Sequence, residues 1–231
     1  MGDEGSAKAS AAQLALELPV DPSFERDDFL PAPSNRNALD MIDQWPDWPD
    51  HALMLVGPPG SGKSHLAAIW ARKASALTAS PRNIPTLQFL NEAKPSALLI
   101  DDVDRVDDET ALFHLLNFLR ENNGFLLMTA AAPPRPESVR LPDLLSRLRR
   151  APMIEIGAPD DELMRAVIEK LFRDSQLSVD PAVIDYVALR LERSLGAARA
   201  FVRNIDHEAL ARGRRVTRPL AAELLERLRE S

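Results

Sequence analysis

Apolar positions between residues 52 and 156 fall into short continuous runs that alternate with amphipathic stretches. The continuous runs cover residues 52–56, 96–100, 125–129 and 153–156, and a more mixed run covers 84–90. Runs of this length predict strands that are buried on both faces. Residues 37–44, 63–78 and 110–121 carry apolar side chains at helical spacing and predict helices. Strands joined by helical crossovers predict an α/β fold, a parallel sheet flanked by helices.

The pattern changes after residue 158. Residues 160–174, 181–191, 194–211 and 218–229 keep helical spacing. Asp180 and Pro181 stand where a helix N-cap and first helical residue are expected. We therefore expect a flexible N-terminal segment at 1–23, an α/β domain at 24–158 and a small all-helical lid domain at 159–231.

Composition narrows the classes of function. The 231 residues include no cysteine, which excludes disulfides, iron–sulfur clusters, thiolate zinc sites and cysteine nucleophiles. No apolar run reaches about 18 residues, so we expect no membrane span. The acidic start lacks the basic and apolar regions of a signal peptide, so we expect a cytoplasmic protein. The net charge of −7 argues against a surface devoted wholly to nucleic acid.

Charge is distributed unevenly along the chain. Residues 1–50 carry 3 basic and 11 acidic side chains, whereas residues 190–231 carry 10 basic and 6 acidic ones. Such an asymmetry is typical either of an interaction face or of helix surfaces that are simply solvated. The sequence leaves both interpretations open.

Residues 57–64, Gly-Pro-Pro-Gly-Ser-Gly-Lys-Ser, match the pattern G-x-x-x-x-G-K-[ST] in full. They lie directly after a predicted strand and before a predicted helix, whose dipole favours phosphate. Gly60 and Gly62 can turn successive N–H groups toward phosphate oxygens. Lys63 can reach the β- and γ-phosphates, and the Ser64 hydroxyl can ligate Mg²⁺. The predicted nucleotide contacts in this segment come from Pro58, Pro59, Gly60, Ser61, Gly62, Lys63, Ser64 and His65.

Two acidic residues end the next buried run. Asp101 and Asp102 stand at the strand end where ligands bind in open α/β sheets. We expect Asp101 to hold the Mg²⁺ hydration shell with Ser64, and Asp102 to stand near an attacking water. Thr129 ends a further strand, so its hydroxyl either faces the γ-phosphate or only ends the strand. Residues 130–132 are all alanine, so we expect weak intrinsic hydrolysis.

Together these motifs resemble those of AAA+ ATPases, and two details resemble the clade of the replication initiator DnaA. His65-Leu66 after Gly-Lys-Ser resembles that clade's G-K-[ST]-H-L. Residues 29–38 resemble its F-V-x-G-x-S-N-x-x-A segment, which implies that Leu30 and Asn35 help to form a base pocket. The resemblance runs from about residue 24 to the end. It implies that ADP or ATP binds with Mg²⁺ between the α/β domain and the helical lid.

The resemblance also implies roles for arginines. Residues 145–148, Leu-Ser-Arg-Leu, resemble the segment that holds the arginine finger. This implies that Arg147 reaches a γ-phosphate on a neighbouring subunit, with Arg149 and Arg150 as alternatives. Residues 193–198 resemble the sensor segment R-E-L-E-G-A, which implies that Arg193 contacts the nucleotide, with Arg199 as the alternative.

Nothing in the sequence resembles the helix-turn-helix domain with which the initiator reads DNA. Residues 13–18, Gln-Leu-Ala-Leu-Glu-Leu, are similar to the peptide with which Hda-like regulators of this clade dock on the DNA polymerase sliding clamp. The residues that this similarity implicates are Gln13, Leu14, Leu16 and Leu18. It implies a regulator that is tethered to the clamp, stimulates hydrolysis of ATP on the DnaA initiator, and binds no specific DNA sequence.

Two other functions stay open. An autonomous AAA+ ATPase of the helicase-loader type would hydrolyse ATP unaided and would not need the Gln13 peptide. A truncated initiator would retain affinity for DNA. The arginine finger implies side-by-side contacts, either with the initiator or with a second copy of the chain as a homo-oligomer.

Overall fold

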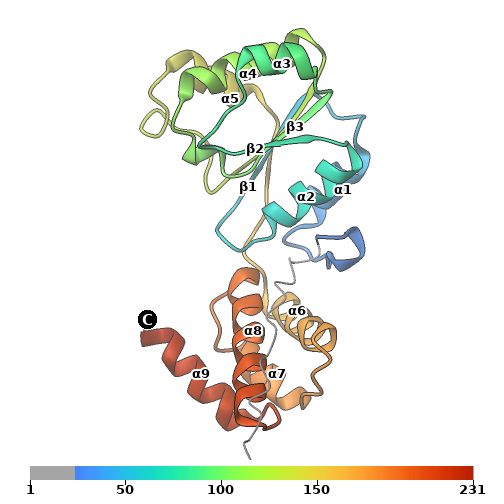
Figure 1. Cartoon of the computed structure of the whole chain (residues 1–231), viewed down its shortest axis with the longest axis vertical. Coiled ribbons are helices and arrows are strands. Elements are labelled where there is room, and N and C mark those ends of the chain that lie inside the picture. The colour runs from blue at the N-terminus through green and yellow to red at the C-terminus, as the bar shows by residue number, and fades with distance from the viewer. Residues whose placement is uncertain (1–23, 231) are drawn as a thin grey trace, which may run out of the picture.

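The computed structural model of the chain describes residues 24–230 and contains a sheet unit followed by a helical unit (Figure 1). The sheet unit comprises η1 (Arg26–Asp28), α1 (Arg36–Gln44), β1 (Ala52–Val56), α2 (Lys63–Lys73), β2 (Leu77–Ala79), α3 (Leu87–Ala93), β3 (Ala97–Ile100), η2 (Val103–Arg105), α4 (Glu109–Glu121), β4 (Phe125–Ala130), α5 (Pro142–Arg150) and β5 (Met153–Glu155). The helical unit comprises α6 (Asp161–Asp174), α7 (Pro181–Ala188), α8 (Leu195–Arg212) and α9 (Arg218–Glu230).

The strands form one parallel sheet in the order β2-β3-β4-β1-β5. In its register Val56 lies opposite Ala130, and Ile100 lies opposite Met128. This order places the carboxyl ends of β3, β4 and β1 next to one another, which is where ligands bind in open α/β sheets. The predicted α/β class with a parallel sheet and flanking helices is confirmed.

Side chains of each central strand alternate between two cores, as expected for a sheet covered on both faces. Met54 and Val56 of β1 pack in the core beneath α3, α4 and α5. Leu53 and Leu55 pack in the opposite core with α1 and α2, where Trp70 is fully buried. The continuous apolar pattern of the strands therefore reflects burial on both sides.

One predicted strand is wrong. Residues 84–90 do not form a strand, because Thr86 caps a helix there and its hydroxyl accepts a hydrogen bond from the Phe89 N–H. The edge strand is instead the short β2. The predicted helix at 63–78 ends at Lys73, since the backbone turns at Ser75 with φ 49° and then enters β2.

The helical unit has a core of its own. Its largest fully buried side chains are Phe172 of α6 and Phe201 of α8. Asp160, Asp180 and Ser194 cap α6, α7 and α8, and each accepts a hydrogen bond from the N–H of its helix's first turn. Within residues 24–230, no helix combines the length and the apolar character needed to cross a membrane.

Candidate functional site

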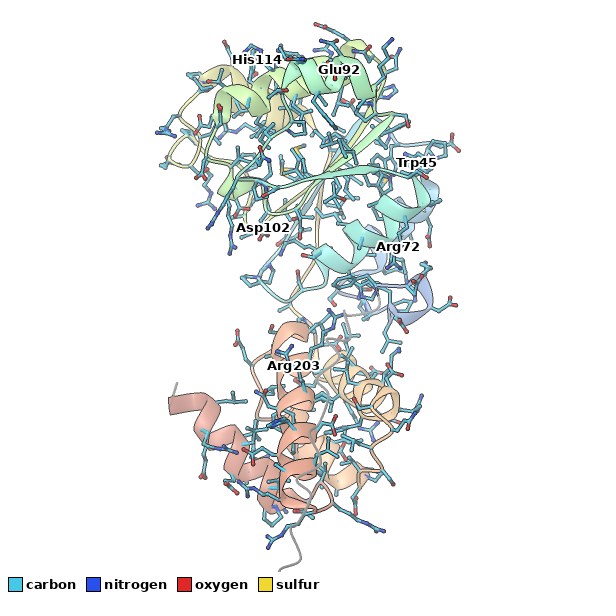
Figure 2. All side chains as sticks on the ribbon, in the orientation of Figure 1. Trp45, Arg72, Glu92, Asp102, His114 and Arg203 are labelled. Atoms are coloured by element: carbon cyan, nitrogen blue, oxygen red, sulfur yellow. The ribbon has the colours of Figure 1, made fainter. Side chains whose placement is uncertain are left out.

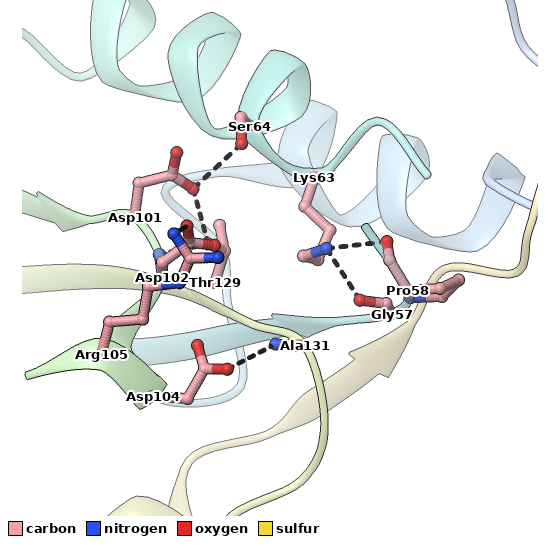
Figure 3. A network of polar contacts seen from close by, with 10 residues as sticks. All are labelled: Gly57, Pro58, Lys63, Ser64, Asp101, Asp102, Asp104, Arg105, Thr129 and Ala131. Atoms are coloured by element: carbon pink, nitrogen blue, oxygen red, sulfur yellow. Dashed lines mark hydrogen bonds and ion pairs between the residues drawn. The ribbon is translucent and has the colours of Figure 1, made fainter. Parts of the chain in front are cut away.

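The phosphate-loop motif forms the tight turn between β1 and α2. Gly60 and Gly62 adopt φ values of 73° and 102°, which side chains disfavour. Lys63 is buried, and its Nζ donates hydrogen bonds to the carbonyls of Gly57 and Pro58 at 2.7 and 3.0 Å (Figure 3). Burial lowers the pKa of Lys63 from its usual value. A cation is thus held inside a loop that carries no acidic side chain.

The predicted magnesium ligands meet at the sheet edge beside this loop. The Ser64 hydroxyl donates to Oδ1 of Asp101 at 3.2 Å (Figure 3). Their oxygens are close enough for one cation to bridge them, and hydroxyl and carboxylate oxygens suit Mg²⁺. Among the described residues, no group of three or more His, Asp or Glu side chains could hold a metal ion, so water and phosphate would supply the other ligands.

Thr129 lies deeper than the sequence suggests. Its side chain is fully buried, and its hydroxyl donates to Oδ1 of Asp101 at 2.6 Å and accepts from the Asp102 N–H at 2.8 Å. In this arrangement the hydroxyl joins β4 to the end of β3 and fixes the acidic pair. A direct contact between Thr129 and a γ-phosphate stays a prediction.

Asp102 lies at the edge of the sheet unit that faces the helical unit (Figure 2). Its backbone is in the left-handed region with φ 58°, and its carboxylate lies 3.5 Å from the Arg105 guanidinium. The side chain is partly exposed, so it remains accessible from solvent at the end of β3. Its predicted role beside an attacking water stays a prediction.

The helical unit touches the phosphate loop directly. The Leu195 N–H at the start of α8 donates to the Gly60 carbonyl at 2.8 Å. A Cβ at Gly60 would lie 2.0 Å from the Ser194 hydroxyl oxygen, so only glycine fits there. Leu195 and Phe29 both lie beside Gly62. The sequence alone does not predict this contact, because it joins two segments that lie far apart in the chain.

The segment predicted to form a base pocket is folded around Asn35. This side chain is buried, accepts from the Ala32 N–H at 2.8 Å and donates to the Leu30 carbonyl at 3.1 Å. The Ser34 carbonyl accepts from the Gly157 N–H at 3.0 Å. These bonds anchor the segment to the connection between β5 and α6. The predicted role of Leu30 and Asn35 in a base pocket stays a prediction.

His65 and Arg199 form a second junction between the two units. The His65 Nε2 lies 3.0 Å from the Glu25 carbonyl, and Nδ1 lies 3.4 Å from Nη2 of Arg199. Only neutral His65 with its proton on Nε2 can make both bonds. Burial lowers the pKa of His65, and Arg199 nearby adds to this effect. The Arg199 guanidinium also lies over the Phe24 ring at 5.2 Å.

The other predicted arginines have partners outside the phosphate loop or are exposed. Arg193 is exposed and pairs with Asp161 of α6 at 2.9 Å. Arg147 of α5 lies over the Phe113 ring of α4 at 4.9 Å, and Arg149 and Arg150 beside it are exposed. The proposed clamp-binding residues Gln13, Leu14, Leu16 and Leu18 lie outside the described residues.

The site has features that fit a bound nucleotide. The Ser61 hydroxyl is buried in the phosphate loop without a hydrogen-bond partner. Lys63 Nζ bonds only to carbonyls of its own loop among the described residues. A phosphate in the loop would offer acceptors to both groups, and unsatisfied buried donors are costly. The residues present therefore suit a nucleoside phosphate with Mg²⁺.

Similarity to known proteins covers most of this chain. No protein-family profile matches the chain. It is 26% identical over 215 residues to the chromosomal replication initiator protein DnaA of Bacteroides thetaiotaomicron. This match covers 81% of this chain and 46% of the relative. The chain thus spans about half the length of this curated relative.

Solved structures give the same fold. Domain III of the Thermotoga maritima replication initiation protein DnaA superposes with a TM-score of 0.74 at 19% identity, covering 90% of this chain and 98% of that one. AMPPCP-bound DnaA from Aquifex aeolicus gives a TM-score of 0.67 at 18% identity, covering 80% and 65%. The chain therefore has the AAA+ fold of domain III of the replication initiator DnaA.

Proposed function

We propose that this chain is a nucleotide-bound, Hda-like regulator that inactivates the replication initiator DnaA. The first part of the proposal is that ADP or ATP binds with Mg²⁺ at the phosphate loop. Lys63 would turn from its loop carbonyls to the phosphates, and Ser64 and Asp101 would hold the Mg²⁺. The AMPPCP-bound DnaA of Aquifex aeolicus, which shares the fold, supports this assignment.

The observation that carries the regulatory part is the position of Arg147. Its guanidinium lies against Phe113 of α4, and none of its contacts within residues 24–230 is with the phosphate loop. A cation on this surface is available to a nucleotide held by another molecule. Guanidinium suits the task because it stays charged and donates hydrogen bonds in a rigid fork. Arginines supplied in trans raise phosphoryl-transfer rates by about 10³–10⁵-fold.

In the proposed reaction, the initiator and this chain supply different catalytic groups. The initiator holds ATP and supplies its own phosphate loop and Mg²⁺ ligands. This chain supplies Arg147 to the γ-phosphate oxygens, where negative charge accumulates as the bond to the β-phosphate breaks. The Gln13 peptide tethers the chain to a sliding clamp on DNA, which raises its local concentration near the initiator. Residues 130–132 offer no polar side chain, which agrees with weak hydrolysis by the chain itself.

The test is a reconstituted reaction with ATP-loaded initiator, sliding clamp on DNA, and the chain with ADP. We expect the chain to accelerate conversion of initiator-bound ATP to ADP, and we expect alanine at Gln13, Leu14 and Leu16 together to abolish that effect and retention on the clamp. The matched control carries alanine at Leu87 and Gln88, an exposed Leu-Gln pair on α3.

Two outcomes would contradict the proposal. Equal stimulation by the Gln13 variant would remove the tether from the mechanism. Rapid ATP turnover by the isolated chain, with no effect on the initiator, would favour the helicase-loader type of AAA+ ATPase instead.

A further inference from the structure

An arginine-rich surface lies at the end of the helical unit farthest from the sheet, where the turn between α8 and α9 is found (Figure 1). Arg214 and Arg215 lie in this turn, and Arg218 begins α9. Arg190 follows α7, which packs against α9. All four side chains are exposed. We call these four residues, together with Tyr186, the arginine patch.

Tyr186 organises the patch. The guanidinium carbons of Arg190 and Arg218 lie 4.0 and 4.7 Å from the centre of its ring. Nη1 of Arg190 also donates to the Tyr186 carbonyl at 3.3 Å. Cation–π contacts of this kind hold a guanidinium in place while leaving N–H groups free to donate. One ring thus keeps two like charges close together, an arrangement that a bound anion would stabilise.

Three arginines of the patch lack an acidic partner. Among the side chains described up to residue 228, Arg214, Arg215 and Arg218 form no ion pair with a carboxylate. The neighbouring arginines behave differently, because Arg212 pairs with Glu208 and Glu223. The paired Arg212 and the unpaired Arg214, Arg215 and Arg218 thus lie within one short stretch around the turn.

The chemistry of the patch favours phosphate over carboxylate side chains as its partner. Every basic residue after Lys170 other than His207 is an arginine. The guanidinium fork matches phosphate oxygens, and it is less strongly hydrated than the ammonium of lysine. A cluster of exposed arginines on one face is the electrostatic footprint of a nucleic-acid backbone.

We propose that the arginine patch binds the phosphate backbone of double-stranded DNA without reading its sequence. Backbone contacts position a protein on a duplex but carry no base information. The inference goes beyond the proposed regulatory function and does not depend on it, since it concerns only this chain and DNA.

The test is fluorescence anisotropy of a random-sequence duplex with the full chain, at about 50 mM salt and then at increasing salt. We expect the triple variant Arg214→Gln/Arg215→Gln/Arg218→Gln to bind about tenfold more weakly or worse, with a salt slope smaller by about two to three. The control variant Arg82→Gln/Lys94→Gln/Arg120→Gln loses the same charge from exposed positions of the sheet unit and should bind like the parent. Thermal melting of each variant checks that it folds.

Several outcomes would overturn the inference. One is that the parent chain does not bind the duplex at low salt, and another is that the triple variant binds it as tightly as the parent. Equal losses in the triple variant and its control would show that net charge, not the patch, governs binding. Displacement by polyglutamate as effective as displacement by unlabelled duplex would assign the patch to an acidic protein partner. None of these measurements involves the clamp or the initiator, so their failure leaves the regulatory proposal untouched.

Discussion

The Thr129 hydroxyl donates a 2.6 Å hydrogen bond to Oδ1 of Asp101, the same oxygen that accepts from Ser64 at 3.2 Å. The carboxylate oxygen next to the phosphate loop is thus held from two sides. The bond from Thr129 comes from a fully buried position on the neighbouring strand. Thr129 thus orients the residue that would hold the cation, and its contact with a γ-phosphate stays a prediction.

Substitution of Thr129 by valine should therefore destabilise the fold and loosen the magnesium site. The variant keeps the shape of the side chain but removes one of the two hydrogen bonds to Oδ1 of Asp101 and leaves the Asp102 N–H without its acceptor, which costs about 1–3 kcal/mol. Chemical denaturation should show this loss in the free energy of unfolding, and Mg²⁺ should enhance nucleotide affinity less than in the parent. Thr129→Ser retains the hydroxyl and should restore both. A valine variant with parental stability and Mg²⁺ dependence would remove Thr129 from this role.

Lys63 provides the test of nucleotide binding. In the parent, ADP at about 1,000 times its dissociation constant should raise the free energy of unfolding by about 4 kcal/mol, because it binds only the folded chain. Lys63→Ala should lose most of this increase, since the lysine ammonium is the main cation of the loop. The measurement is thermal unfolding with and without ADP. Equal stabilisation of parent and variant would mean that the nucleotide lies elsewhere.

His65 should make stability depend on pH. Burial lowers the pKa of His65 in the folded state. Below about pH 6.5, His65 therefore binds a proton in the unfolded chain more readily than in the folded chain. The free energy of unfolding should therefore fall as pH drops from about 7 to 5.5, with a contribution of at most about 1.4 kcal/mol per pH unit from this group.

His65→Gln isolates that contribution. Glutamine does not titrate, yet it can still donate to the Glu25 carbonyl and accept from Arg199. Its unfolding free energy, measured by urea titration at each pH, should fall less steeply than that of the parent. Identical slopes would show that His65 is not the titrating group.

The sequence predicted most of the sheet unit because its signals are local. Continuous apolar runs marked four of the five strands, and the phosphate loop and the acidic pair were found by spacing alone. β2 was missed because its three residues, Leu77, Thr78 and Ala79, are too short a run to stand out. The helix at 87–93 was mistaken for a strand because its cap, Thr86, sits inside an apolar stretch.

Contacts between the two units could not be predicted in the same way. The bond from Leu195 to Gly60 and the His65–Arg199 pair join residues that are more than 130 positions apart. They depend on how the helical unit is placed on the sheet unit, which no local pattern records. Arg199, the alternative to Arg193, lies at this junction beside His65, whereas Arg193 pairs with Asp161. Which of the two contacts the nucleotide stays a prediction.

The most direct test of the central claim compares Arg147→Ala with Arg149→Ala in the reconstituted reaction with clamp on DNA and ATP-loaded initiator. Both variants lose one arginine from the last turn of α5, so their net charges are matched, and thermal unfolding with ADP checks that fold and ADP binding are retained. We expect Arg147→Ala to lose the stimulated hydrolysis, by about 10³-fold or to the initiator's own rate, and Arg149→Ala to retain it. Full stimulation by Arg147→Ala would show that Arg147 is not the arginine that acts on the initiator's nucleotide.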